Sequence, residues 1–145
     1  MRVAALDLGR RRVGIAVSDP SGTLATPWRS VTGEGTAVEV ATRVTRVLRG
    51  FDAENPVSLV VVGLPVHLDG RPHDAAPRAQ AVVHAMATQT GWTVVLQDER
   101  LTSVEAEQRL AAREMNWRKR KAKLDAAAAA VILQEYLDTP DRPSP

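Results

Sequence analysis

The sequence predicts an α/β fold in which helices cover both faces of a mixed β-sheet. The first evidence is a succession of three strand-like segments, at residues 3–8, 13–18 and 24–31, joined by connections short enough for antiparallel pairing. The second is a pair of nearly all-apolar segments, 57–62 and 92–97, whose pattern is typical of strands buried on both faces. Helical segments separate and follow these later strands, so we expect a sheet that starts antiparallel and continues parallel.

The helical segments are recognised mainly by apolar residues at spacings of three and four. The first covers about residues 36–50 and the second about 78–90, with Gly91 as its C-terminal stop. A third helix is expected from residue 102, where a Thr and a Glu have the spacing of a capping box, to about residue 113. The last helix is expected at 124–137.

Length and composition limit the class of protein. The chain has 145 residues, and we expect one domain over 1–138 and a disordered, proline-rich tail over 139–145. Hydrophobic residues make up 44% and charged residues 25%, as in ordinary soluble proteins. There is no cysteine, which excludes disulfides, thiolate metal sites and cysteine nucleophiles. No apolar run approaches the about 20 residues that span a bilayer and no signal peptide is evident, so we expect a cytoplasmic protein without membrane contact.

Positive charge is concentrated in two clusters, although the formal net charge is only +2. Arg10–Arg12 lie in the turn between the first two strands, and Arg118–Lys123 place five cations among six residues in a predicted loop before the last helix. Such clusters suit phosphate backbones, and a solvated loop that keeps the protein soluble is the alternative. The expected nucleic-acid contacts are Arg12, Arg118, Arg120, Lys121 and Lys123.

Three further kinds of side chain have open interpretations. Arg78 begins the second helix, where it either meets a phosphate or is solvated. Trp117 precedes the second basic cluster, where it either stacks on a base or covers the core. The histidines, at positions 67, 73 and 84, show no metal-ligand spacing.

Carboxylates at three separate places are candidates for one site. Asp7 lies inside an apolar strand, where an isolated charge is costly unless it is paired, solvated or bound to a cation. Asp98 and Glu99 end the last strand, and because adjacent residues face opposite ways, only one of them easily faces a shared site. Asp125 opens the last predicted helix. Each has a structural alternative: a salt bridge for Asp7, a turn for the Asp98–Glu99 pair, and a helix N-cap for Asp125.

Convergence of Asp7, Glu99 and Asp125 would place negative charges close together, which raises their pKa values unless cations neutralise them. Carboxylate oxygens are hard ligands that suit Mg²⁺ or Mn²⁺. Two such ions about 4 Å apart can activate a water and stabilise the leaving oxygen of a phosphodiester. The pattern therefore indicates a metal-dependent nuclease.

Four motifs, in order along nearly the whole chain, resemble the YqgF/RuvX family. They are residues 7–19 (DLGRRRVGIAVSD), 62–65 (VGLP) with 69–70, 98–103 (DERLTS) with Ala106, and 121–125 (KAKLD) with the following alanine-rich stretch. The resemblance implies a ribonuclease H-like fold whose five-stranded mixed sheet has the order 3-2-1-4-5. It also implies an acidic triad at Asp7, Glu99 and Asp125 that is both catalytic and metal-binding.

The family is described both as Holliday junction resolvases and as nucleases that mature precursor small-subunit ribosomal RNA. We therefore expect cleavage of phosphodiester bonds in structured nucleic acid by a divalent-metal-dependent enzyme. Ribosomal RNA processing is favoured, because a junction resolvase makes two symmetric cuts as a dimer and the sequence shows no obligate dimer face; a monomer or weak homodimer is expected. Two other classes stay open: a nucleotide-binding ATPase relative, based on the Asp-x-Gly hairpin, and a non-catalytic nucleic-acid-binding ribosome-assembly factor.

Overall fold

The computed structural model describes residues 2–9, 11–65, 76–99 and 117–139, with the backbone alone at 65, 98–99 and 117–125. Five strands are present: β1 (Arg2–Leu8), β2 (Arg12–Ser18), β3 (Ala25–Thr32), β4 (Val57–Pro65) and β5 (Thr93–Glu99). The helices of the described part are α1 (Ala37–Asp52), α2 (Ala76–Gln89) and α4 (Trp117–Asp138). The helix predicted at 102–113 and most of the predicted tail lie outside the described residues.

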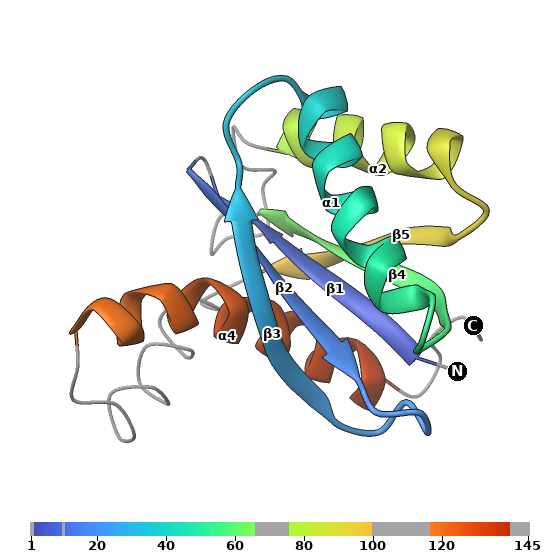
Figure 1. The fold of residues 1–145 in the computed structure, drawn as a ribbon, viewed down its shortest axis with the longest axis vertical. Coiled ribbons are helices and arrows are strands. Elements are labelled where there is room, and N and C mark those ends of the chain that lie inside the picture. Colours follow the sequence, from blue (N-terminus) through green and yellow to red (C-terminus); the bar gives the residue numbers. More distant parts are fainter. Residues whose placement is uncertain (1, 10, 66–75, 100–116, 140–145) are drawn as a thin grey trace.

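The five strands form one sheet in the order β3-β2-β1-β4-β5. Strand β1 pairs antiparallel with β2, which pairs antiparallel with β3, whereas β1, β4 and β5 run parallel to one another. Helices α1 and α2 cover one face of this sheet and α4 crosses the other (Figure 1). The predicted mixed sheet, its strand order and its helices on both faces are thus confirmed.

Alternation along the strands divides the interior into two cores. Ala4 and Leu6 of β1 belong to the core under α1 and α2, while Val3 and Ala5 belong to the core under α4. The α4 side includes small residues, among them Ala129, which is fully buried. Small side chains on both partners let a helix backbone approach a sheet closely.

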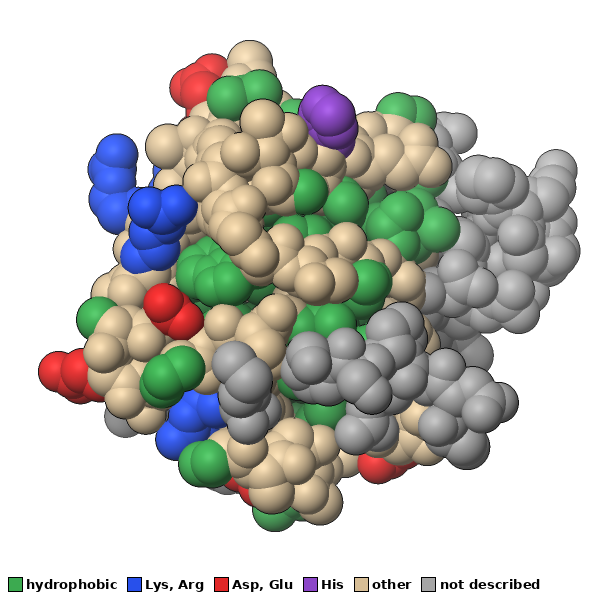
Figure 2. Space-filling model, turned by 90° about the vertical axis from the view of Figure 1, so that its right-hand side faces the viewer, with side chains coloured by type: hydrophobic (Ala, Val, Ile, Leu, Met, Phe, Trp, Pro, Cys, Tyr) green, Lys and Arg blue, Asp and Glu red, His purple; other side chains and the backbone are tan. Residues whose placement is uncertain are grey.

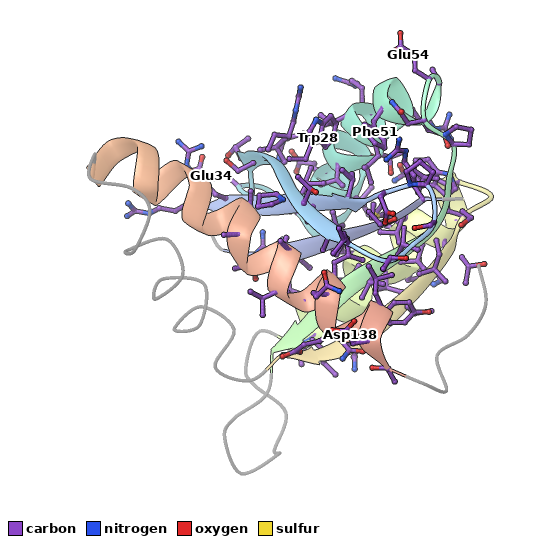
Figure 3. All side chains as sticks on the ribbon, turned by 90° about the horizontal axis from the view of Figure 1, so that it is seen from below. Trp28, Glu34, Phe51, Glu54 and Asp138 are labelled. Atoms are coloured by element: carbon purple, nitrogen blue, oxygen red, sulfur yellow. The ribbon has the colours of Figure 1, made fainter. Side chains whose placement is uncertain are left out.

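The edge of the α1 and α2 core is closed by aromatic side chains. A register shift in the β2–β3 pairing leaves Trp28 as an extra residue on β3, a β-bulge. Its ring lies 5.1 Å from that of Phe51 at the end of α1, and both rings are labelled in Figure 3. The Arg29 guanidinium stacks 4.4 Å from the Trp28 ring centroid. Figure 2 shows that hydrophobic side chains also reach the surface on the face that forms the right-hand side of Figure 1.

The N-terminus of α1 carries a complete capping box. The Thr36 side chain accepts a hydrogen bond from the Glu39 backbone N–H, and the Glu39 carboxylate accepts one from the Thr36 backbone N–H.

Strand β4 continues to Pro65, three residues beyond the predicted end. None of the helices in the described part is long and apolar enough to cross a membrane.

The start of α4 differs from the prediction. The helix begins at Trp117, so the predicted basic loop is wrong: Arg118, Arg120, Lys121 and Lys123 lie in its first two turns. Lys and Arg have high helix propensity, although their charge opposes the positive end of the helix dipole. The start at Trp117 also removes the N-cap explanation of Asp125, whose backbone lies two turns inside α4.

Candidate active site

Asp7 lies at the carboxyl end of the central strand, one residue before β1 ends, and is half-buried. It pairs with Gly14 of β2 in the antiparallel ladder. Its neighbours Leu6 and Leu8 belong to the core under α1 and α2, whereas Val3 and Ala5 belong to the core under α4. By alternation, Asp7 continues the row of residues that faces α4, just beyond the packed part of that row.

The ends of β4 and β5 lie at the same edge of the sheet as Asp7, because these strands run parallel to β1. Pro65 of β4 pairs with Glu99, the last residue of β5. Val95 of β5 packs against the core under α4, and position 99 has the same parity along the strand as Val95. By alternation, positions 7 and 99 therefore both belong to the rows of the sheet that face α4, and position 98 belongs to the opposite face. The Asp98 and Glu99 side chains themselves lie outside the described part.

Helix α4 is anchored near the beginning of β1. The Gln134 side chain accepts a hydrogen bond from the Ala25 N–H and donates one to the Thr23 carbonyl. Ala25 pairs with Ser18, whose hydroxyl accepts a hydrogen bond from the Val3 N–H. This chain of contacts places the C-terminal half of α4 at the end of the sheet where β1 starts.

The beginning of α4 lies toward the other end of the sheet. Figure 1 shows α4 starting on the side where β1 ends, and Figure 3 shows Glu34 on that side and Asp138 on the opposite one. Counting back from Gln134 to Asp125 covers about 13 Å of helix. Counting forward from Val3 to Asp7 covers about 13 Å of strand. Residue 125 therefore lies about 13 Å of helix from Gln134, on the part of α4 that is nearer the side where β1 ends.

The turn after Asp7 is packed against the loop that follows β3. The Gly9 N–H donates to the Asp7 carbonyl at 3.2 Å, and the Gly33 N–H donates to the Arg11 carbonyl at 2.8 Å. A Cβ on Gly33 would lie 2.6 Å from the Gly9 oxygen, and one on Gly9 would lie 2.5 Å from the Arg12 oxygen. Both positions therefore require glycine for close backbone contact.

Two arginines donate to the backbone carbonyls of this region. Arg78, in the first turn of α2, donates from Nη1 to the Gly9 carbonyl at 2.8 Å and from Nη2 to the Gly33 carbonyl. Arg43 of α1 donates to the Thr32 carbonyl at 2.7 Å and to the Glu34 carbonyl at 3.1 Å. The sequence suggested a phosphate contact or a solvated position for Arg78, and it gave no signal for these pairings.

Of the predicted nucleic-acid contacts, Arg12 is the one whose side chain is described. It is exposed at the start of β2, at the same end of the sheet as Asp7, and lies 3.5 Å from the Ser30 hydroxyl. The backbone of α4 carries the remaining four, at positions 118, 120, 121 and 123.

Among the side chains that the structure describes, no group of three His, Cys, Asp or Glu residues could hold a metal ion. The predicted triad is not among the groups searched, because the Glu99 and Asp125 side chains lie outside that set. The backbone places positions 7 and 99 near the carboxyl ends of two strands of the sheet, and position 125 on the helix that crosses one face of it.

Comparison with known sequences identifies relatives over nearly the whole chain. A family model described as "RuvX: Holliday junction resolvase" matches residues 1–139. A protein of Anaeromyxobacter dehalogenans (strain 2CP-C) is 40% identical over 138 residues, which cover 95% of this chain and 97% of the relative. A protein of Pelotomaculum thermopropionicum is 34% identical over 143 residues, covering 99% and 90%. Both relatives carry the name "Putative pre-16S rRNA nuclease".

Comparison with solved structures supports the fold. RuvC of Thermus thermophilus, solved in complex with a Holliday junction substrate, matches with a TM-score of 0.53 and 17% identity. The match covers 94% of this chain and 93% of RuvC. The expected ribonuclease H-like fold is thereby confirmed, and the sequence matches identify the lineage: this chain belongs to the RuvX family.

Proposed function

We propose that this chain is a divalent-metal-dependent nuclease that processes precursor small-subunit ribosomal RNA in the cytoplasm. The observation that carries the proposal is the place of Asp7, a half-buried carboxylate at the carboxyl end of the central strand, on the row facing α4. The names of the two relatives support RNA as the substrate. Ligands of open α/β sheets gather at this end of the strands, which supports the location of the site.

We assign Asp7, Glu99 and Asp125 as the catalytic and metal-binding residues. Position 99 has the strand parity of Val95, which packs under α4. Position 125 lies one helical turn before the buried Ala129, so the backbone carries it on the sheet-facing side of α4.

This oxygen-rich set fits Mg²⁺ or Mn²⁺. When bound, two such ions would supply Lewis-acid activation of water and neutralisation of charge on the phosphate. The protein supplies the placement of the carboxylates. Asp7 is held in β1 by its antiparallel pairing with Gly14 of β2, and the residues that precede it, Arg2–Leu6, pair with β4 on the other side of the strand.

The basic residues are proposed to hold the substrate backbone. Arg12 is exposed beside the site, and the first two turns of α4 bring four more cations on a continuous helix. Contacts of this kind release counterions from the nucleic acid, so binding should weaken steeply as salt is raised. The four residues of α4 are Arg118, Arg120, Lys121 and Lys123.

A cleavage assay tests the proposal. Labelled precursor small-subunit ribosomal RNA and a synthetic four-way DNA junction are incubated with the purified protein in Mg²⁺, in Mn²⁺ or with chelator. We expect metal-dependent RNA cleavage that Asp7→Asn abolishes and that Asp138→Asn, a matched change at the exposed end of α4, leaves intact. Equal cleavage by Asp7→Asn and the wild type would contradict the assignment. Binding without cleavage by the wild type would favour the non-catalytic assembly factor.

A junction resolvase is the second candidate, because the matching family model carries that description. It requires two symmetric cuts and hence a dimer on the junction. We propose a monomer or a weak homodimer, and sedimentation of the protein with and without the junction distinguishes the two functions. Paired cuts in the DNA junction with no cleavage of the RNA would favour the resolvase.

A further inference from the structure

We propose that Arg78 is a positioning residue that fixes the turn following Asp7 and thereby the placement of the Asp7 carboxylate. The inference rests on the proposed nuclease function and goes beyond it, because Arg78 belongs neither to the acidic triad nor to the proposed phosphate contacts. It starts from two hydrogen bonds made by one half-buried guanidinium.

The two acceptors come from segments far apart in the chain. Gly9 lies just after β1, and Gly33 lies just after β3, whereas Arg78 belongs to the first turn of α2. The planar guanidinium presents several N–H donors in a fixed fork, so a single side chain can serve both carbonyls. Arg78 therefore ties α2 to two loops at the end of the sheet where Asp7 lies.

The glycines show why a cation is needed there. Their backbones approach so closely that a Cβ on Gly33 would lie 2.6 Å from the Gly9 carbonyl oxygen. Both carbonyl oxygens accept from the same guanidinium, which brings the negative ends of two peptide dipoles together. Without the positive charge, these dipoles would repel each other and weaken the packing of the two loops, which the bond from the Gly33 N–H to the Arg11 carbonyl would then hold alone.

The link from this contact to Asp7 is short. The Gly9 carbonyl is held by Arg78, and the Gly9 N–H donates to the Asp7 carbonyl at 3.2 Å. The opposite loop is also tied to the turn, because the Gly33 N–H donates to the Arg11 carbonyl. Release of Arg78 would free both carbonyls and let the segment after Asp7 move.

The alternative role for Arg78 is a direct phosphate contact, and the two roles differ in kinetics. A positioning residue affects the geometry of the reacting groups, so its loss lowers kcat and leaves KM unchanged. A phosphate contact contributes to binding, so its loss raises KM and reduces the salt slope of binding by about one. Kinetics at several salt concentrations therefore separates these two roles.

The test compares Arg78→Lys and Arg78→Met with Arg46→Met, which removes an exposed arginine of α1. We expect kcat to fall by about 10- to 100-fold in Arg78→Met, as for other residues that orient catalytic groups, and by less in Arg78→Lys, which keeps the charge but loses the planar fork. The KM, the salt slope and the kinetics of Arg46→Met should stay unchanged. Thermal unfolding identifies any variant that is not folded. If Arg78→Met does not fold, the test rests on Arg78→Lys, which keeps the positive charge and a single donor nitrogen.

Amide hydrogen exchange gives a readout that does not need activity. The Gly33 N–H should exchange faster in the Arg78 variants than in the wild type, because its bond to the Arg11 carbonyl depends on the clamped loops. Unchanged exchange together with unchanged kcat would overturn the proposal, and so would a raised KM with a smaller salt slope. If the wild type cleaves no substrate, the proposed function fails, while the Gly33 exchange rate still decides whether Arg78 holds the turn.

Discussion

Substitution of Gly33 by alanine tests the close packing of the two loops beside Asp7. The added Cβ would lie 2.6 Å from the Gly9 carbonyl oxygen, 0.8 Å closer than the 3.4 Å at which ordinary contacts begin. The facing atom is backbone and is held by Arg78, so it cannot rotate away as a flexible side chain would. Overpacking of this kind costs about 1–3 kcal/mol.

Part of that cost is offset in the unfolded chain, where alanine has less freedom than glycine by about 0.4–1 kcal/mol. We therefore expect Gly33→Ala to lower the free energy of unfolding by about 1–2 kcal/mol, which corresponds to a fall in Tm of about 3–7 °C for a chain of this size. Urea unfolding followed by circular dichroism measures the first quantity, and a thermal melt measures the second.

Gly50 provides a matched control for the same substitution. It lies within α1, and a Cβ there would meet no atom of the described residues within 4 Å. Because glycine is unfavourable in helices, Gly50→Ala should raise the free energy of unfolding by about 0.5–1 kcal/mol. If Gly33→Ala is as stable as the wild type, or if both variants are destabilised by similar amounts, the loops are not packed as described.

Three further predictions concern other parts of the fold. The Thr45 hydroxyl is buried and has no hydrogen-bond partner within the described part of the chain, so Thr45→Val should raise the free energy of unfolding by about 1 kcal/mol. Ala129 is fully buried where α4 meets the sheet, so Ala129→Leu should lower the free energy of unfolding by about 1–3 kcal/mol in urea unfolding. Hydrogen bonds from the Ser21 hydroxyl and from two backbone N–H groups hold the pKa of Asp19 well below its usual range. Because the folded pKa is the lower one, Asp19 stabilises the fold above its usual pKa, and this contribution is lost as the pH falls through the folded value.

Each of these predictions has an outcome that contradicts it. A less stable Thr45→Val variant would mean that the hydroxyl has a partner. An Ala129→Leu variant of wild-type stability would mean that α4 packs loosely. For Asp19, the carboxylate should remain ionised in an NMR titration at pH values where ordinary aspartates have become protonated, and Asp19→Ala should lose less stability than the wild type on acidification. Titration of Asp19 in the ordinary range would show that its turn is not formed.

Most of the fold was predictable because apolar periodicity follows burial. Strands β1 and β2 were predicted to within one residue at their starts, and the all-apolar pattern of β4 identified a strand covered on both faces. The strand order followed from the family resemblance. The start of α4 was missed because a run of cations resembles a solvated loop, whereas the structure places it in the first two turns of the helix.

The site was predictable only in part. Asp7 was identified because a carboxylate inside an apolar strand requires an explanation. The structure places it, half-buried, at the end of the row of β1 residues that faces α4. The contacts of Arg78 were not predictable, because its acceptors lie 69 and 45 residues away in sequence and are backbone carbonyls. Every residue has a backbone carbonyl, so no particular residue type in the sequence indicates the partner of such a side chain.

The corrected start of α4 also changes the competing explanations of Asp125. As a helix N-cap, this residue would need no function, because an aspartate there satisfies backbone N–H groups and complements the helix dipole. Two turns inside α4, those N–H groups are already bonded within the helix. An acidic residue one turn before the fully buried Ala129, on a helix that begins toward the end of the sheet containing Asp7, then needs another reason to be there. The proposed cation, shared with Asp7, would supply that reason, and the loss of the N-cap alternative favours the proposed acidic site over a purely structural role for Asp125.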